Sequence, residues 1–279
     1  MKAFVTALLA TLAATEDFNM QLAEISRELS VDAYCGRQKY DNLIWSGLVS
    51  GFVKTYTIWN SNNGTEGFIG YLPLNNSIYV VFKGSDDIEN FVADLNTDKD
   101  PYHAWPECDC KVHDGFQNGA DSVSGAVIAE VLRLLDIYPN AAVRTTGHSL
   151  GAALAQLTGM WLLKAGINVE QMINFGAPRV GDKDYASFSD SIWRDQFRMV
   201  NNDDWIPHLP PSYWPFDFYQ TSEEVYEDKN GNYTMCGPGE NPDCCDSHTF
   251  YSITDHLVYM DQCMGDLCGN CHTYDEVTQ

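Results

Sequence analysis

One short stretch of this 279-residue chain has the residue types that nucleophilic catalysis needs. Residues 147–151 read Gly-His-Ser-Leu-Gly, between a strand-like segment (142–146) and a segment rich in Ala and Leu (150–164). In such a context the serine sits on a sharp strand-to-helix turn that lifts its hydroxyl above a sheet, and glycines avoid collisions within that turn. The pentapeptide alone is common by chance, so its position between strand and helix is what predicts that Ser149 is a nucleophile.

The partners of a nucleophilic serine are a histidine that removes its proton and a carboxylate that orients the histidine. In folds built around this turn the acid follows the serine along the chain and the histidine comes last. Asp203 and Asp204 come one residue after a strand-like segment (197–201), so we expect the acid there. His208 is too near these carboxylates in sequence to reach back. Spacing alone leaves three later histidines open: His248, His256 and His272.

The elements that must position these groups alternate between strands and helices. Apolar residues on one helical face predict a first helix over 18–35. The continuous apolar run 77–82 is typical of a strand buried on both faces. Further strands are expected at 55–59, 67–72, 141–146, 171–175 and 197–201, and further helices at 121–136 and 150–164. This alternation predicts an α/β fold with a mostly parallel central sheet flanked by helices.

The first residues resemble a secretory leader rather than part of the fold. Lys2 precedes an apolar stretch (3–14), and polar residues follow it. We therefore expect a signal peptide at 1–15 and one mature domain at 16–279. About 12 apolar residues are too few to cross a bilayer, which takes roughly 20, and no other stretch is apolar for long enough. No integral membrane span is expected.

Composition excludes several classes of protein. The chain has 16 basic and 39 acidic residues, a formal charge of −23. Nucleic acid and anionic membranes are held by basic residues, so neither a nucleic-acid partner nor a polybasic anchor is expected. With 44% hydrophobic residues the chain can form a large core, which excludes disorder throughout.

Cysteine usage agrees with export. There are nine cysteines, so at least one thiol stays outside any intramolecular disulfide. Their spacing lacks the two matched ligand pairs of common zinc sites, and we expect no metal. Three sequons are candidates for N-glycosylation, at Asn63, Asn75 and Asn232.

Six ordered segments together make the chain resemble the class 3 (fungal-type) lipase family of α/β-hydrolases. They are VFKGS at 81–85, VHDGF at 112–116, GHSLG at 147–151, FGAPRVG at 175–181, DWIPHLPP at 204–211 and DHL at 255–257. The segments extend over most of the chain in the family's order. The family includes secreted triacylglycerol lipases, phospholipases A1 and feruloyl esterases.

The resemblance implies roles for particular residues. Ser149 matches the family's nucleophile, Asp204 its acid and His256 its histidine, which together need no cofactor. The oxyanion donors are expected to be Ser85 and the backbone N–H of Leu150. Where the family commonly has Arg, this chain has Lys83.

A helix that covers the site is expected just after Ser85. Four apolar residues have the spacing i, i+3, i+4 and i+7 of one helical face: Ile88, Phe91, Val92 and Leu95. Acidic residues, including Asp86, lie largely elsewhere. By position the segment matches the family's lid, and its apolar face favours a lipase over a feruloyl esterase. The later Tyr102 and Trp105 could line an acyl groove or belong to the core.

The resemblance also suggests a disulfide framework with one free thiol at Cys245. The suggested pairs are Cys35 with Cys268, Cys236 with Cys244, Cys263 with Cys271, and Cys108 with Cys110.

Taken together, the chain is expected to be a secreted, monomeric serine carboxylic-ester hydrolase that cleaves acylglycerols at a lipid–water interface. Its destination is the exterior or the lumen of a digestive, lysosome-like vacuole. The rival enzymes are a phospholipase A1 and a feruloyl or other soluble-ester esterase. A non-catalytic lipid-binding protein on the same fold is the remaining alternative.

Overall fold

A central β-sheet organises the molecule. The computed structural model describes residues 18–247, 251–265, 268 and 271–273. These residues form an eight-stranded sheet in the order β1-β2-β3-β6-β7-β8-β9-β10. Its strands are β1 (Val53–Asn60), β2 (Thr65–Leu72), β3 (Ser77–Phe82), β6 (Ala142–Gly147), β7 (Val169–Phe175), β8 (Gln196–Asn201), β9 (Glu223–Glu227) and β10 (Tyr233–Pro238). Two short ribbons pair β4 (Lys99–Pro101) with β5 (Lys111–His113) and β11 (Val258–Tyr259) with β12 (Gln262–Cys263).

The middle of the sheet is parallel and its two edges are antiparallel. Strands β3, β6, β7, β8 and β9 run parallel, whereas β1, β2 and β3 form a meander and β10 returns antiparallel to β9. All six residues of β3 are buried, as its apolar run predicts. The expected α/β class with a mostly parallel central sheet is confirmed.

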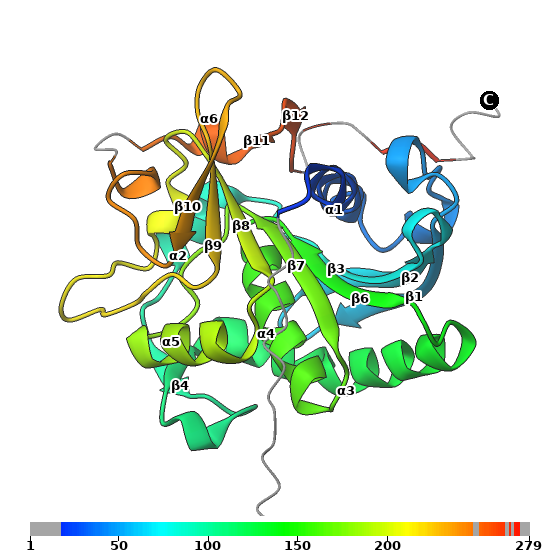
Figure 1. Cartoon of the computed structure of the whole chain (residues 1–279), viewed down its shortest axis with the longest axis horizontal. Coiled ribbons are helices and arrows are strands. Elements are labelled where there is room, and N and C mark those ends of the chain that lie inside the picture. Colours follow the sequence, from blue (N-terminus) through cyan, green and yellow to red (C-terminus); the bar gives the residue numbers. More distant parts are fainter. Residues whose placement is uncertain (1–17, 248–250, 266–267, 269–270, 274–279) are drawn as a thin grey trace, which may run out of the picture.

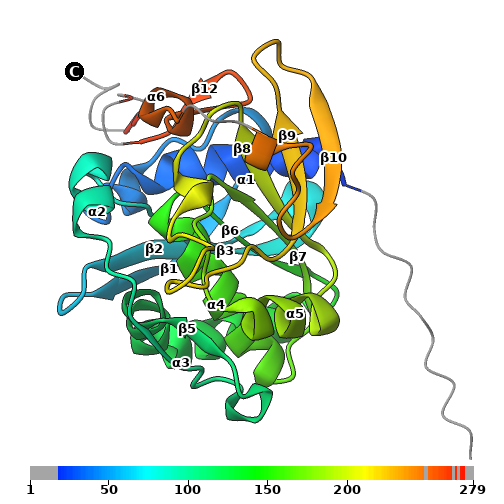
Figure 2. The same ribbon diagram turned by 90° about the vertical axis from the view of Figure 1, so that its left-hand side faces the viewer.

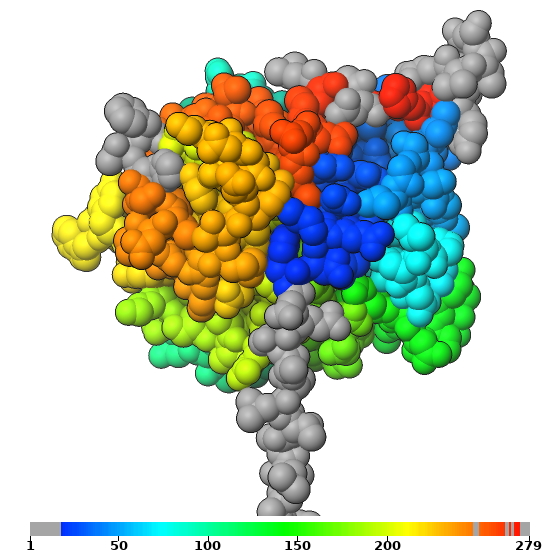
Figure 3. Space-filling view, turned by 45° about the horizontal axis from the view of Figure 1, so that its top comes forward, coloured from blue at the N-terminus to red at the C-terminus, as the bar shows by residue number. Residues whose placement is uncertain are grey.

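Helices cover both faces of the sheet (Figure 1). The helices are α1 (Met20–Ala33), α2 (Ile88–Asp94), α3 (Asp114–Ile137), α4 (Leu150–Lys164), α5 (Lys183–Ile192) and α6 (Ile253–His256). Helices α3 and α4 pack on one face, and α1 contacts β3, β6 and β7 on the other. The 90° view separates these layers, with α3, α4 and α5 on one side of the sheet and α1 on the other (Figure 2). On the surface, α1 lies beside the β9–β10 ribbon (Figure 3).

Several elements differ from the sequence-based expectation, which also lacked α5, α6 and the two short ribbons. Helix α3 begins at Asp114 rather than near 121, because the His113 side chain accepts hydrogen bonds from the backbone N–H groups of Gly115 and Phe116. Two glycines in its first turns hide this start from a periodicity search. The β9–β10 ribbon was not expected, since β9 reads Glu-Glu-Val-Tyr-Glu. Its buried Glu224 is compensated by Arg198 of β8, with the charged atoms 2.7 Å apart.

In the described part of the chain, no helix combines the length and the hydropathy that crossing a bilayer requires. The expected leader, residues 1–15, lies outside the described residues.

Candidate active site

Ser149 occupies the sharp turn between β6 and α4. Its backbone has φ 58° and ψ −128°, a conformation that non-glycine residues rarely adopt. A Cβ on Gly147 would lie 2.3 Å from the carbonyl oxygen of Gly151, and one on Gly151 would lie 2.4 Å from that of Phe82. The flanking glycines are therefore required by close backbone approach, and the turn projects Ser149 from the carboxyl edge of the parallel strands.

Asp204 lies at the same edge, shortly after β8. It is fully buried and accepts hydrogen bonds from the backbone N–H of Ile206 at 2.8 Å and from the hydroxyl of Tyr259. Its two carboxylate oxygens lie 3.0 and 2.9 Å from Nδ1 of His256. The neighbouring Asp203 is half-buried and accepts from the amide of Asn202.

The structure separates the histidines that spacing left open. His256 is buried at the end of α6 and contacts Asp204. His272 lines a different cavity with residues of α1, and His248 lies outside the described residues. His208, set aside on spacing, has its Nδ1 3.3 Å from a carboxylate oxygen of Asp246.

Ser149 and His256 face a common cavity of about 400 Å³, which Ser85 and Ile88 also line. Ser149 Oγ and His256 Nε2 are both buried, and neither makes a hydrogen bond to any described residue. Because Nδ1 must donate to the Asp204 carboxylate, Nε2 carries the free lone pair. The nucleophilic Ser149 Oγ and the basic His256 Nε2 therefore face the same cavity, both without a hydrogen-bond partner among the described residues.

A second histidine, His148, holds His256 in place, and this role was not predicted from the sequence. His148 stacks on the His256 ring at 4.4 Å, and its Nε2 donates to the His256 carbonyl at 2.8 Å. Its Nδ1 then accepts from the hydroxyl of Tyr34 at 2.6 Å. Burial, with His256 nearby, lowers the pKa of His148 well below its ordinary value, so it stays neutral. The sequence signal that could have identified His148 is its position within the pentapeptide 147–151, directly before Ser149.

Two glycines were also missed. A Cβ on Gly176 would lie 2.7 Å from the His256 ring and 2.9 Å from Asp204, and one on Gly84 would lie 2.1 Å from the Tyr34 hydroxyl. Both belong to the segments that carry the family resemblance. The close packing explains why these segments contain glycine.

The expected oxyanion donors lie next to the nucleophile. Ser85 borders the same cavity as Ser149, and Leu150 is the first residue of α4. The first N–H groups of a helix have no intrahelical acceptor, so the Leu150 N–H is available to an anion. Lys83, which stands where the family commonly has Arg, pairs with Asp86 at 2.5 Å and so joins the strand end to the segment before α2.

Helix α2 lies over this region with its apolar face inward. Asp87 caps it by accepting from the backbone N–H of Asn90. Ile88 lines the cavity of Ser149, whereas Phe91 and Leu95 line an adjoining groove of about 370 Å³ with Ser85 and Leu150. Val92 is half-buried, and Asp86 is exposed. Ser149 and His256 are both 0% exposed, so the site is shielded from water in this state.

The two later aromatics belong to the core. Tyr102 is 2% exposed and packs edge-on against Tyr185. Trp105 packs against Phe188, with the ammonium of Lys164 over its ring. Of the two alternatives left open for them, the structure supports the core, because Tyr102 belongs to the main core cluster and the half-buried Trp105 packs against it.

Four disulfides form, and two of the suggested pairs are wrong. Cys108 pairs with Cys110 and Cys236 with Cys244, as suggested. The other pairs are Cys35 with Cys271 and Cys263 with Cys268, not Cys35 with Cys268 and Cys263 with Cys271. The reason is tertiary: Leu43 forms a β-bridge with Thr273, and the backbone N–H of Ile44 donates to the carbonyl of His272. This pairing brings Cys271, rather than Cys268, to the end of α1.

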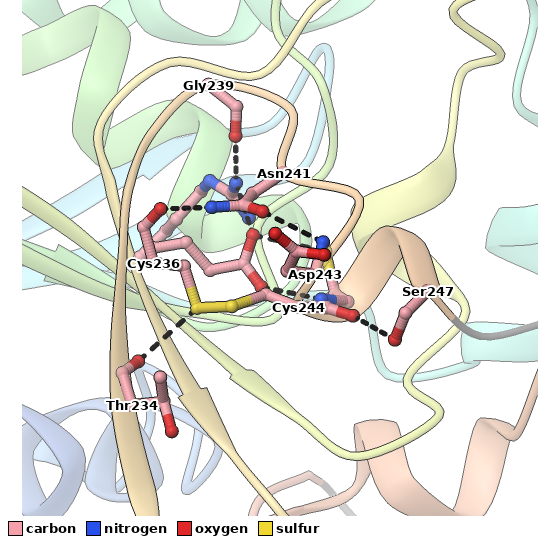
Figure 4. The surroundings of a disulfide bond; sticks show 10 residues. Thr234, Cys236, Gly239, Asn241, Asp243, Cys244 and Ser247 are labelled. Atoms are coloured by element: carbon pink, nitrogen blue, oxygen red, sulfur yellow. Dashed lines mark hydrogen bonds and ion pairs between the residues drawn. A yellow bond between two sulfur atoms is a disulfide. The ribbon is translucent and has the colours of Figure 1, made fainter.

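Cys245 is the free thiol, and it is buried. It directly follows Cys244, whose disulfide with Cys236 is shown in Figure 4. Its Sγ donates to Glu224 at 3.2 Å, and Arg198 pairs with the same carboxylate. Burial raises the pKa of Cys245, so the thiol stays protonated and unreactive. This is a packed structural thiol.

The strained serine between a parallel strand and a helix, on a mostly parallel sheet, defines an α/β-hydrolase. The family model for lipase (class 3) matches residues 79–214. The chain is 37% identical to a lipase of Rhizomucor miehei over 243 residues, which cover 83% of this chain and 66% of that protein. It is 30% identical over 168 residues to a secreted mono- and diacylglycerol lipase of Malassezia globosa, covering 58% and 53%.

A solved structure agrees over most of the chain. The triacylglyceride lipase of Rhizomucor miehei superposes with a TM-score of 0.81 at 30% identity, covering 89% of this chain and 96% of that one. The chain belongs to the class 3 lipase family. It spans about half to two thirds of the length of the curated relatives that it matches.

Proposed function

We propose that this protein is a serine carboxylic-ester hydrolase of the triacylglycerol lipase type, with residues 16–279 as one catalytic domain. One observation carries the proposal: Ser149 Oγ and His256 Nε2 face one cavity without a hydrogen-bond partner among the described residues, while His256 Nδ1 lies on Asp204. A serine, a base and an orienting acid are what acyl transfer requires.

The chemistry follows from these atoms. Ser149 Oγ attacks the ester carbonyl as His256 Nε2 takes its proton, and Asp204 stabilises the resulting imidazolium. The Ser85 hydroxyl and the Leu150 N–H stabilise the oxyanion. The C–O bond to the alcohol then breaks, and His256 returns the proton to the leaving alkoxide. Water repeats the sequence on the acyl-enzyme and releases the carboxylic acid.

The substrate class follows from the surroundings of the cavity. Helix α2 turns its apolar face towards the site, which suits an acyl chain better than a phenolic ester. Relatives are named triacylglyceride lipase and mono- and diacylglycerol lipase, which supports acylglycerols as substrates. We assign α2 the role of a lid that moves at a lipid surface and uncovers Ser149.

Export of a monomer completes the proposal. Four disulfides are typical of an oxidising compartment, and two relatives are named as secreted lipases, which favours the exterior over a vacuole. Asn63 and Asn232 are exposed and suited to carry glycans. Asn75 is half-buried and therefore less accessible, whereas the amides of all three donate hydrogen bonds and do not distinguish them.

The test replaces Ser149 with Ala. Wild-type protein and Ser149→Ala are compared by pH-stat titration on emulsified triglyceride, phospholipid vesicles and methyl ferulate. We expect the triglyceride rate to be highest and the variant's kcat to fall by about 10⁶. Ordinary activity in the variant would refute the nucleophile. A faster rate on phospholipid or ferulate would replace the substrate class with that of a phospholipase A1 or an esterase, and no hydrolysis at all would favour a lipid-binding protein.

A further inference from the structure

The most exposed large apolar side chain among the described residues lies on one loop. Residues 211–218, here named the aromatic loop, connect the segment after Asp204 to the approach of β9. Trp214 is 88% exposed and Tyr213 is 66% exposed. Large aromatic side chains gathered in water at one place mark an interaction surface.

This exposure is part of a defined conformation. The backbone N–H of Phe216 donates to the carbonyl of Tyr213 at 2.9 Å, and the two rings pack edge-on at 5.4 Å. The ammonium of Lys99 donates to the carbonyls of Phe216 and Asp217 at 2.8 Å each. These hydrogen bonds hold the loop backbone in one conformation. Binding through Trp214 therefore requires little further loss of backbone entropy.

The aromatic loop adjoins the covered site. Lys99 belongs to β4, which follows α2 along the chain. The ring of Phe218, at the end of the loop, lies 6.1 Å from His113, which lines the groove beneath Phe91 and Leu95. In Figure 1 the yellow loop projects on the side where α2 lies, and in Figure 3 it protrudes from the edge of the molecule.

A second exposed aromatic lies by the triad. Tyr251 is 51% exposed and stacks on Trp205, the residue after Asp204, at 6.5 Å. Ser252 forms a β-bridge with Asp204, and Ile253 lines the cavity of Ser149. Exposed aromatics therefore accompany both the groove and the catalytic cavity.

The negative charge around α2 and on the aromatic loop determines which kind of surface the loop can bind. The exposed charged residues on α2 and in the segments that flank it are acidic: Asp86, Asp87, Glu89, Asp94, Asp98 and Asp100. Asp217 adds an exposed carboxylate on the loop itself. A surface with this charge repels anionic lipid and acidic partners, whereas Trp and Tyr rings suit the boundary between apolar and aqueous phases.

We propose that the aromatic loop, with Trp214 at its tip, docks on an uncharged lipid–water interface and brings that interface to the groove beneath α2. The proposal rests on the proposed ester hydrolase function, since docking supplies the substrate phase to Ser149. Trp214 is a docking residue and has no part in the chemistry.

Binding is tested without turnover in the Ser149→Ala background. The full chain is mixed with triolein droplets and its partition is measured by co-flotation. Adding Trp214→Ala should lower the partition about tenfold, and Trp214→Phe should restore most of it. The matched control is Ile137→Ala, which removes a 53% exposed side chain at the far end of α3, about 36 Å from that helix's start. Equal partition of the Trp214→Ala and Ile137→Ala proteins would overturn the proposal, provided that their circular dichroism melting curves agree.

Two further experiments test whether the aromatic loop binds an anionic lipid surface or a second copy of the chain instead. Droplets that contain phosphatidylglycerol should bind less protein at low salt, with the difference narrowing as salt is added. Tighter binding to these droplets would contradict an uncharged interface. If Ser149→Ala sediments as a dimer that Trp214→Ala dissociates, the loop is a subunit contact and the proposal fails. Hydrolysis of soluble p-nitrophenyl butyrate by the wild type, lost in Ser149→Ala, tests the catalytic proposal separately.

Discussion

At the scale of single residues, the proposed catalytic acid and base are packed closely against their neighbours. Asp204 accepts from three groups, and the carbonyl of His256 is fixed by the neutral His148. A Cβ added to Gly176 would collide with both His256 and Asp204. Geometry at this site is therefore sensitive to a single methyl group.

Gly176→Ala tests this sensitivity. The added Cβ would lie 2.7 Å from the His256 ring, and φ of 56° also disfavours alanine. We expect kcat on a soluble ester to fall at least 100-fold, because displacement of a catalytic base by about 1 Å has an effect of that size. Steady-state kinetics provide the measurement.

The matched control is Gly231→Ala in the turn between β9 and β10. Its φ of 75° imposes the same kind of backbone strain, but no atom lies within 4 Å of the new Cβ. It should lose about 1 kcal/mol of stability and keep its activity. If both variants lose activity equally, the effect is one of folding and the packing argument fails.

At the scale of elements, α1 does more than cover the sheet. It brings Tyr34 to His148 and carries two half-buried carboxylates one turn apart, Glu28 and Asp32. Burial, with the charge of Glu28, raises the pKa of Asp32 from 3.8 to about 7. Folded Asp32 therefore keeps its proton in a pH range where the unfolded chain has lost it.

The sign of the pH dependence follows from this shift. The free energy of unfolding should fall as pH rises from about 4 to about 7, because the folded state binds more protons than the unfolded state there. Asp32→Asn should make this slope shallower and raise the free energy of unfolding by about 2 kcal/mol at pH 8, with little change at pH 4. Urea denaturation at pH 4 and at pH 8 measures the free energy of unfolding. Asp136→Asn, on the exposed face of α3, is the control. Parallel pH profiles for wild type and Asp32→Asn would refute the assignment.

At the scale of the whole molecule, one disulfide joins the two ends of the described chain. Cys35 and Cys271 are 236 residues apart, whereas Cys236 and Cys244 are 8 apart. A crosslink restricts the unfolded chain more when the loop that it closes is longer.

Removing these two disulfides should therefore lower the free energy of unfolding by different amounts. The double variant Cys35→Ser, Cys271→Ser should lose about 5 kcal/mol of unfolding free energy, and Cys236→Ser, Cys244→Ser about half as much. Denaturant titration of the oxidised proteins measures both values. Equal losses, or a larger loss for the short loop, would contradict the loop-length argument.

Local signals were enough for most of the sheet. The run 77–82 and the helix 150–164 coincide with β3 and α4. They were readable because periodicity and turn residues act within one element. The β9–β10 ribbon was not readable, since Glu224 is tolerated in a buried strand only through Arg198 of another strand.

The sequence by itself determined that Ser149 occupies a strand-to-helix turn, because the glycines around it satisfy a local steric demand. It also determined the amphipathic pattern of α2. Spacing left three histidines open as the partner of Asp204, and the family resemblance selected His256. Only the tertiary structure decided which cysteine meets Cys35 and which aromatic residues face water. Asp204 and His256 are 52 residues apart, and Cys35 and Cys271 are 236 apart. Packing between distant elements brings such residues together, and no local pattern encodes that distance.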